Sequence, residues 1–226
     1  MKYSETNLLT SITVIFVGFI IVSFYIRYKF ISLHENNLKV TSNSGLDGCH
    51  LIRYLLDKLN IDIEINVIDE HLNGNYDPKN KEINLSKEIC HSNSLSALSI
   101  TAHEVGHLLQ DKDNYKLFNF LVKLYPLAEF GASVSWILII SGLIFPQLIL
   151  LFATGLLLLL IALTYQLLQF PLEIDASNRA IKLLIKHKLI SKNEIDKVSE
   201  MLDYAALSFL AEPANLFFEF FDKIRR

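Results

Sequence analysis

The residues of this 226-residue sequence that are best placed to do chemistry are His103, Glu104 and His107, which form an H-E-x-x-H motif. Residues four positions apart lie on one face of a helix, so both imidazoles can reach one metal ion. Catalytic zinc takes three protein ligands and leaves one position for a water molecule, which the metal activates. Glu104, beside the first ligand, would accept the proton of that water during attack on a peptide carbonyl. The motif therefore predicts a hydrolase with one Zn²⁺ ion and with Glu104 as general base.

The third zinc ligand must come from elsewhere in the chain, and we favour Glu173. No histidine follows the motif at the spacing of the longer zinc-binding motifs, and the only later histidine is His187. Glu173 follows a long apolar run and shares a helical face with Ser177, Ala180 and Leu184. A carboxylate on an apolar face needs a partner, and a metal ion supplies one. A helix-terminal charge and an ion pair with a basic residue are the alternatives.

The motif must be carried by a helix within a small folded unit. Residues 31–126 are polar, mixed in charge and periodic, which predicts a small α+β domain. A helix is expected after Gly48, strands at 61–68 and 81–85, a turn at 76–80, and the motif helix after a cap at one of residues 92–94. We expect the strand Glu82–Leu85 to present an exposed edge that pairs with an extended substrate, although a plain edge strand is equally compatible.

Three apolar runs predict membrane helices, at residues 8–26, 127–145 and 148–170. The first would be an anchor within residues 1–30, because the run is too long for a cleaved signal peptide and no cleavage site follows it. The other two would form a hairpin within residues 127–170, with its tip at 146–147 and small residues at 131–135 for close packing. A buried hairpin in a soluble core is the alternative. Pro171 would open a helical C-terminal region, residues 171–226, whose apolar end we place at the interface or on the bundle.

Three crossings place residues 27–126 and the region after 171 on the same side of the membrane, so the candidate zinc ligands share a compartment. Basic residues flank that side, against Lys2 alone near the other face: Arg27, Lys29, Lys123, Arg179 and Lys182. The positive-inside rule then predicts that the domain is cytoplasmic. Cys49 and Cys90 are accordingly expected as free thiols, with a disulfide as the alternative in an oxidising compartment.

The composition agrees with a membrane protein. Hydrophobic residues make up 51% of the chain, charged residues 20%, and the mean hydropathy is +0.33. The net charge of −3 and the lack of a long basic run argue against nucleic acid as a partner. The expected partners are a protein or peptide substrate and the lipid bilayer; the sequence gives no signal for the oligomeric state.

Several segments resemble the YugP-like neutral zinc metallopeptidases, a bacterial family of small membrane proteins. The resemblance runs from about Gly45 to Ala205 and rests on SGLDGCHLIRYLLDKLNI, YDPKNKEINLS, SITAHEVGHLLQD, GASVSW and FPLEIDASNRAI. It implies a zincin-like peptidase fold and a membrane location, and kinship with membrane proteases in which the glutamate of an E-x-x-x-D segment is the third ligand. Glu173 matches that glutamate, whereas Ser177 stands where the aspartate would be. Ser177 could still orient a ligand histidine through a hydrogen bond.

The expected function is therefore that of a membrane-anchored zinc endopeptidase acting on membrane or membrane-proximal proteins. An intramembrane protease is disfavoured, because the polar residues of the motif helix do not suit lipid. A non-catalytic zinc-binding scaffold or adaptor is the other alternative, and Glu104 argues against it, since a structural site needs no base. Tyr76 is a weaker candidate for an oxyanion donor.

Overall fold

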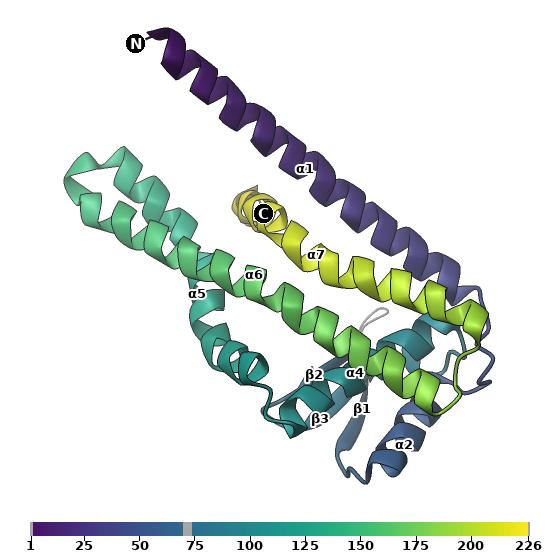
Figure 1. Ribbon diagram of the computed structural model, residues 1–226. Helices are drawn as coiled ribbons and strands as arrows, with labels where there is room; N and C mark the ends of the chain where they lie inside the picture. The colour runs from purple at the N-terminus through teal and green to yellow at the C-terminus, as the bar shows by residue number, and fades with distance from the viewer. Residues whose placement is uncertain (1, 70–73, 226) are drawn as a thin grey trace.

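The computed structural model describes the backbone of residues 2–69 and 74–225, and their side chains except those of 2–13, 15–16, 146 and 211–225. Long helices extend from one side of a compact head of short helices and strands (Figure 1). The elements are α1 (Lys2–Leu38), α2 (Gly48–Leu59), β1 (Glu64–Ile68), β2 (Gly74–Asp77), β3 (Glu82–Ser86), α3 (Lys87–Cys90), α4 (Leu95–Lys112), α5 (Lys116–Ile144), η1 (Pro146–Leu148), α6 (Ile149–Lys186) and α7 (Lys192–Arg225).

The head contains a three-stranded sheet in the order β1-β3-β2. Strand β3 runs parallel to β1 and antiparallel to β2, so the expectation that residues 82–85 present an open edge is wrong. The physical reason is burial, because Ile83 and Leu85 are fully buried and their strand is paired on both sides. The turn expected at 76–80 is also partly wrong, since Tyr76 and Asp77 end strand β2. The residues of β2 are polar and have little strand propensity, so the sequence does not indicate this strand.

Helices α2 and α4 form as their sequences predict. Asp47 caps α2 by accepting a hydrogen bond from the His50 N–H (2.8 Å), and Ser94 caps α4 by accepting one from the Ala97 N–H (3.1 Å). The apolar face of α4 is buried against the sheet and α2, with Ala102 and Val105 at 0% exposure. The H-E-x-x-H residues lie in the middle of α4, which is therefore held rigidly by the core.

Cys49 and Cys90 form a disulfide, so the expectation of free thiols is wrong in this structure. The start of α2 and the end of α3 lie side by side, with 4.6 Å between the two Cα atoms. That separation is within the range that a disulfide requires, and it arises because both helices pack on α4.

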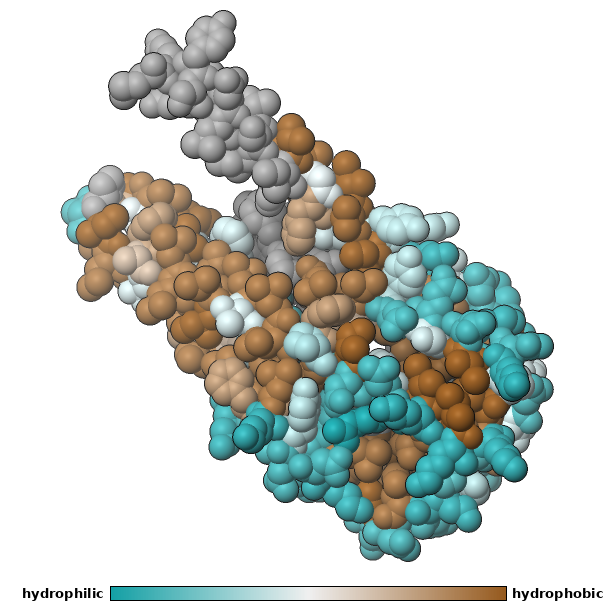
Figure 2. Space-filling view, viewed as in Figure 1, coloured by the Kyte–Doolittle hydropathy of each residue, from teal (hydrophilic) through white to brown (hydrophobic). Residues whose placement is uncertain are grey.

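Within the described residues, three helices are long and apolar enough to cross a membrane, in agreement with the three predicted spans: Val17–Leu38 of α1, α5 and α6. Apolar side chains cover the hairpin of α5 and α6, whereas the head is mostly hydrophilic (Figure 2). The two hairpin helices approach closely at small residues. A Cβ added to Gly131 would lie 2.8 Å from the Leu158 carbonyl oxygen, and one added to Gly155 would lie 2.9 Å from that of Ser135.

Helix α6 continues from the membrane hairpin into the head without a break, so the expectation that Pro171 opens a new helix is wrong. Pro171 has no N–H to donate, but the segments on both sides are strongly helical and packed on α4 and α5, which keeps one helix. Helix α5 contains Pro126 and is bent (Figure 1). The predicted domain limits at residues 30, 126 and 170 stay a prediction, and α1, α5 and α6 each run through one of them.

Helix α7 packs against α1 and α6. Glu194 in its first turn accepts hydrogen bonds from the backbone N–H groups of Ser191 (2.7 Å) and Asn43 (2.9 Å). It thereby ties α7 to the loop that follows α1. The side chains of the apolar C-terminal stretch at 211–225 lie outside the described part of the structure.

Candidate active site

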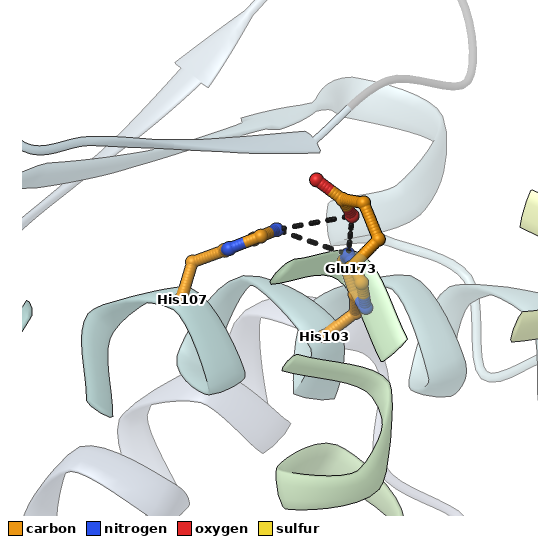
Figure 3. A group of neighbouring side chains, drawn as sticks. All are labelled: His103, His107 and Glu173. Carbon is orange, nitrogen blue, oxygen red and sulfur yellow. Dashed lines mark hydrogen bonds and ion pairs between the residues drawn. The ribbon is translucent and has the colours of Figure 1, made fainter. Parts of the chain in front are cut away.

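His103, His107 and Glu173 converge at the junction of helices α4 and α6 (Figure 3). Nε2 of His103 lies 3.0 Å from Oε2 of Glu173 and 3.1 Å from Nε2 of His107, and the third separation, His107 Nε2 to Glu173 Oε2, is 3.3 Å. The two histidines come from successive turns of α4, and the glutamate comes from beyond the membrane hairpin. Within the described residues, this is the group of histidine, cysteine and acidic side chains that could hold a metal ion.

The spacing of these three atoms fits zinc. With zinc–nitrogen and zinc–oxygen bonds of about 2.0–2.1 Å, two ligands of a tetrahedral ion lie about 3.3 Å apart. The three separations of 3.0–3.3 Å are close to that edge length. The donor set of two imidazoles and one carboxylate is also one that catalytic zinc uses. The role of these residues as zinc ligands stays a prediction, but the arrangement can hold the ion.

The hydrogen bonds of Gln110 determine which nitrogen of His107 faces the cluster. The Gln110 Nε2 group donates to the Leu172 carbonyl oxygen (2.8 Å) and to Oδ2 of Asp175 (2.9 Å), both of which can only accept. The Gln110 amide oxygen must therefore face Nδ1 of His107, 3.0 Å away, and accept its proton. Nε2 of His107 is then left unprotonated in the neutral ring, with its lone pair directed at the cluster.

Ser177 contacts the other histidine, as predicted from the sequence. Its Oγ lies 3.3 Å from Nδ1 of His103, and the residue is 2% exposed. The serine is one helical turn beyond Glu173 on the buried face of α6. Ser177 can therefore orient the His103 ring, with a longer and uncharged contact than a carboxylate would make.

Glu104 lies beside the cluster but outside it. Its Oε2 accepts a hydrogen bond from the backbone N–H of Tyr76 on β2 (2.8 Å), and the residue is 6% exposed. A Cβ added to Gly74 would lie 3.4 Å from Cγ of Glu104, so the edge strand crosses directly over this side chain. Glu104 is thus a buried carboxylate whose position is fixed by a hydrogen bond, and it lines the wall of a cleft.

The charges of the cluster stabilise one another. Burial disfavours the ionised form of Glu173, but the neighbouring His107 and His103 rings outweigh it and hold the Glu173 pKa well below its usual value. Burial likewise disfavours the charged form of His107, but the Glu173 carboxylate outweighs it and raises the His107 pKa to about 9. The Glu173 carboxylate and the protonated His107 ring therefore form an ion pair, and a cation bound at the cluster would replace the His107 proton.

Sequence reasoning missed the polar network that surrounds the cluster. Asp175 accepts hydrogen bonds from Gln110 and, at 2.7 Å, from Nε of Arg179, whose guanidinium also reaches Asp113 at 2.5 Å. The available signal was spacing: Gln110 lies three residues after His107, on the same face of the helix. The network joins the end of α4 to the segment of α6 that carries Glu173.

A cleft of about 560 Å³ opens on the cluster. Its polar wall is β2 with the following turn, residues 74–79, together with Glu104, and its floor holds His103, His107 and Glu173. The remaining wall is mainly apolar and comes from three helices: Phe118, Leu121, Val122 and Tyr125 of α5, Tyr165, Gln169 and Leu172 of α6, and Ala205 and Phe209 of α7. A peptide chain lying along this cleft would pass directly over the cluster.

The other candidates from the sequence do not join the cluster. The Tyr76 hydroxyl donates to Asp111 (2.5 Å), and burial followed by this carboxylate raises the Tyr76 pKa above its usual value. His187 packs edge-on to Tyr54.

The molecule is thus mostly helical, with three candidate membrane spans among the described residues and a candidate metal centre at the base of its hairpin. A family model described as "putative neutral zinc metallopeptidase" matches residues 12–225. The chain is 31% identical over 199 residues to the "putative membrane protease YugP" of Bacillus subtilis (strain 168), with 88% of each chain covered. No solved structure matches. The chain therefore belongs to this family of neutral zinc metallopeptidases, as its sequence resemblance predicted.

Proposed function

We propose that this protein is a membrane-anchored zinc endopeptidase that hydrolyses peptide bonds of membrane or membrane-proximal proteins. The observation that carries the proposal is the convergence of two Nε2 atoms and one carboxylate oxygen within 3.0–3.3 Å beside a cleft. His103, His107 and Glu173 would hold the zinc ion in a zincin-like site. When bound, zinc supplies Lewis-acid polarisation of the scissile carbonyl and activation of water.

The residues of the chain would divide the remaining work. Glu104 would take the proton of the attacking water on a carboxylate oxygen and pass it to the leaving amine. The Tyr76 N–H holds that carboxylate at the cleft wall, so its position is set before substrate binds. Gln110 and Ser177 would keep the Nε2 atoms of the two histidines directed at the metal.

The substrate would lie along β2. This strand is paired with β3 on one side, and no strand of the described residues pairs with its other side. We therefore transfer the expected β-augmentation from residues 82–85 to the edge of Gly74–Asp77, which crosses over Glu104.

Two other functions fit less well. A structural zinc site for a scaffold would fill all four positions with protein ligands, whereas Glu104 stands outside the cluster on the cleft wall. An intramembrane protease would carry the motif in a spanning helix, and α4 is not one of the candidate spans in the described residues.

The deciding experiment measures zinc and peptidase activity together. Purified wild type, Glu104→Ala, Glu173→Ala and the control Glu64→Ala, which changes an exposed carboxylate of β1, are compared by metal analysis and by cleavage of casein. We expect Glu104→Ala to keep zinc and to lose a factor of about 10² or more in rate. Glu173→Ala should lose both, and Glu64→Ala neither. Equal zinc in all four proteins would reject Glu173 as a ligand, and full activity of Glu104→Ala would reject the general base.

We also propose that the head faces the cytoplasm, on the strength of the basic residues that flank it. The Cys49–Cys90 pair is a built-in test, since the cytoplasm keeps such pairs reduced and an exterior location keeps them bonded. The structure shows this pair bonded, so maleimide labelling of rapidly acid-quenched cells decides the side: two thiols that label without reduction would place the head in the cytoplasm. A pair that labels only after chemical reduction would place the head outside.

A further inference from the structure

The position of the cluster along α6 gives its depth relative to the bilayer. Large apolar side chains on α6 are exposed from Ile149 (64%) to Leu167 (59%), and the next one along the helix is Ile185, near its end in the head. That stretch is about 28 Å long at a helix rise of 1.5 Å per residue, close to the roughly 30 Å of the hydrocarbon core. Glu173 lies six residues further on, about 9 Å beyond the apolar stretch. The cluster therefore lies at the outer limit of the headgroup region.

The cleft extends from that level back toward the lipid. Tyr165 lies within the apolar stretch of α6, and Tyr125 lies where the bent helix α5 enters its span; their rings are 6.1 Å apart. At the other end, Pro78 and Lys79 belong to the hydrophilic head. One continuous cleft thus joins the bilayer surface, the candidate zinc ligands and the unpaired edge of β2.

The apolar wall is built from one face of each helix that lines it. On α5, Phe118, Leu121, Val122 and Tyr125 have the spacing of a single helical stripe. Phe118 lies close to both β2 and the cluster, with its ring 6.4 Å from those of Tyr76 and His107. A chain entering from the lipid would therefore keep apolar side chains on an apolar wall until it reaches Glu104.

We propose that the substrates are polypeptides anchored by a membrane span, and that they are cut within about three to six residues of the end of that span. The lower limit follows from the geometry, since an extended chain needs about three residues to cover 9 Å. The proposal rests on the proposed peptidase function and adds the substrate class and the place of the cut. The depth of the site would act as a ruler, because it sets the distance along the chain between the span and the cut. A soluble protein has no span from which that distance could be set.

The test uses the full chain with zinc, reconstituted in liposomes. The substrate is one spanning helix followed by 20 or so residues of a uniform repeat, so that every position offers similar chemistry, and mass spectrometry locates the cuts. The same repeat without the span is the comparison, and Glu104→Ala is the control for contaminating proteases. We expect cuts within about three to six residues of the span, and a much slower reaction of the soluble repeat.

Cuts spread evenly along the repeat, or equal rates for anchored and soluble repeats, would overturn the ruler while leaving a zinc peptidase in place. No cleavage of either substrate or of casein by zinc-loaded protein would overturn both the ruler and the peptidase function. The two failures are therefore distinguishable.

A pair of variants on α5 provides a second test. Tyr125 lines the cleft and is 44% exposed, whereas Phe120 is 51% exposed and does not line it, so both should tolerate alanine. Tyr125→Ala should lower the preference for the anchored over the soluble repeat by about tenfold, the value of one lost aromatic contact. Phe120→Ala should leave the preference unchanged. Equal behaviour of the two variants would contradict an apolar wall that guides the chain.

Discussion

The head and the membrane hairpin are held together in different ways, although one helix, α6, belongs to both. In the head, apolar side chains such as Leu51, Ile83 and Leu98 are almost fully buried around α4. In the hairpin, Leu150 and Leu160 remain 76% and 61% exposed, and the helices meet instead at Gly131, Gly142 and Gly155. In lipid, burying a leucine side chain between helices gives no hydrophobic stabilisation, so close packing of the helix backbones would stabilise the hairpin instead.

This difference explains how a carboxylate from beyond the two candidate spans of the hairpin can reach the candidate metal site. The hairpin sets the direction of α6, and the head grips its end through α4 and the Gln110–Asp175–Arg179 network. The contacts in the head then decide whether Glu173 reaches the two histidines. The substitutions below weaken one region or the other.

The largest effect is expected where α4 and α6 touch in the head. A Cβ on Gly106 would lie 2.4 Å from the carbonyl oxygen of Ala176, a backbone atom that cannot move aside. Gly106→Ala should therefore push α6 away, destabilise the protein by about 3 kcal/mol and lower its zinc content. Thermal unfolding in detergent and metal analysis measure both. The control is Gly18→Ala on α1, where nothing lies within 4 Å and alanine should be neutral or slightly stabilising. Full zinc content and an unchanged melting temperature of Gly106→Ala would contradict the tight contact.

The substitution Gln110→Leu removes the hydrogen bonds by which the head holds α6, while the volume of the side chain stays nearly the same. The His107 ring would lose its acceptor, and the Leu172 carbonyl would lose a donor. Zinc affinity should fall about 10- to 100-fold, as measured by competition with a chromogenic chelator. The visible spectrum of Co²⁺-substituted protein should also shift, which a purely structural loss would not cause. Ser99→Ala, at a buried serine of the same helix that bonds only its own turn, is the matched control. Equal zinc affinities of the two variants would show that Gln110 does not support the site.

Much of this site was readable from the sequence because its signals are local. The spacing of His103, Glu104 and His107 on an amphipathic helix predicts shared geometry directly, and the apolar runs predict the hairpin. Glu173 was reachable only by combining the helical face it shares with Ser177 with the topology that returns the chain to the head. The convergence of His103, His107 and Glu173 could be predicted because helical periodicity and bilayer thickness are properties of short segments.

The inferences that failed depend on contacts between distant segments. The central position of β3 follows from its pairing with β2, whose residues Gly74–Asp77 have no strand-like composition. The Cys49–Cys90 bond depends on how α2 and α3 pack on α4, and the continuity of α6 through Pro171 depends on its neighbours. Gln110 gave no signal apart from its spacing to His107, because its role requires partners on α6.

A smaller effect is expected from the same substitution in the hairpin. A Cβ on Gly155 would meet the Ile139 N atom at 2.8 Å and the Ser135 oxygen at 2.9 Å. Gly155→Ala should destabilise the hairpin by about 2 kcal/mol, because it removes the close packing on which this region relies. Unfolding by SDS in mixed micelles measures the loss. Thr154→Ala, at the neighbouring exposed position, should have no such effect. Zinc content should stay normal in both, and a loss of zinc in Gly155→Ala would show that the two regions are not separable.

The smallest effect concerns the junction of the head with α7, where the packing depends on a titratable group. Burial disfavours ionised Glu194, but the N–H groups of Ser191 and Asn43 outweigh it and lower the Glu194 pKa. A lowered pKa in the folded state stabilises the protein above the unfolded pKa of about 4.5, and this stabilisation is lost as the pH falls through the folded value. Glu194→Gln should therefore cost about 1 kcal/mol at pH 7 and progressively less below about pH 4.5. Hydrogen exchange should show the loop at residues 39–45 opening early in acid in the wild type, while the hairpin, which is held by uncharged contacts, remains protected. A stability difference between wild type and variant that stays constant from pH 7 to pH 3 would contradict this role, because it would show that the charge of the Glu194 carboxylate contributes nothing.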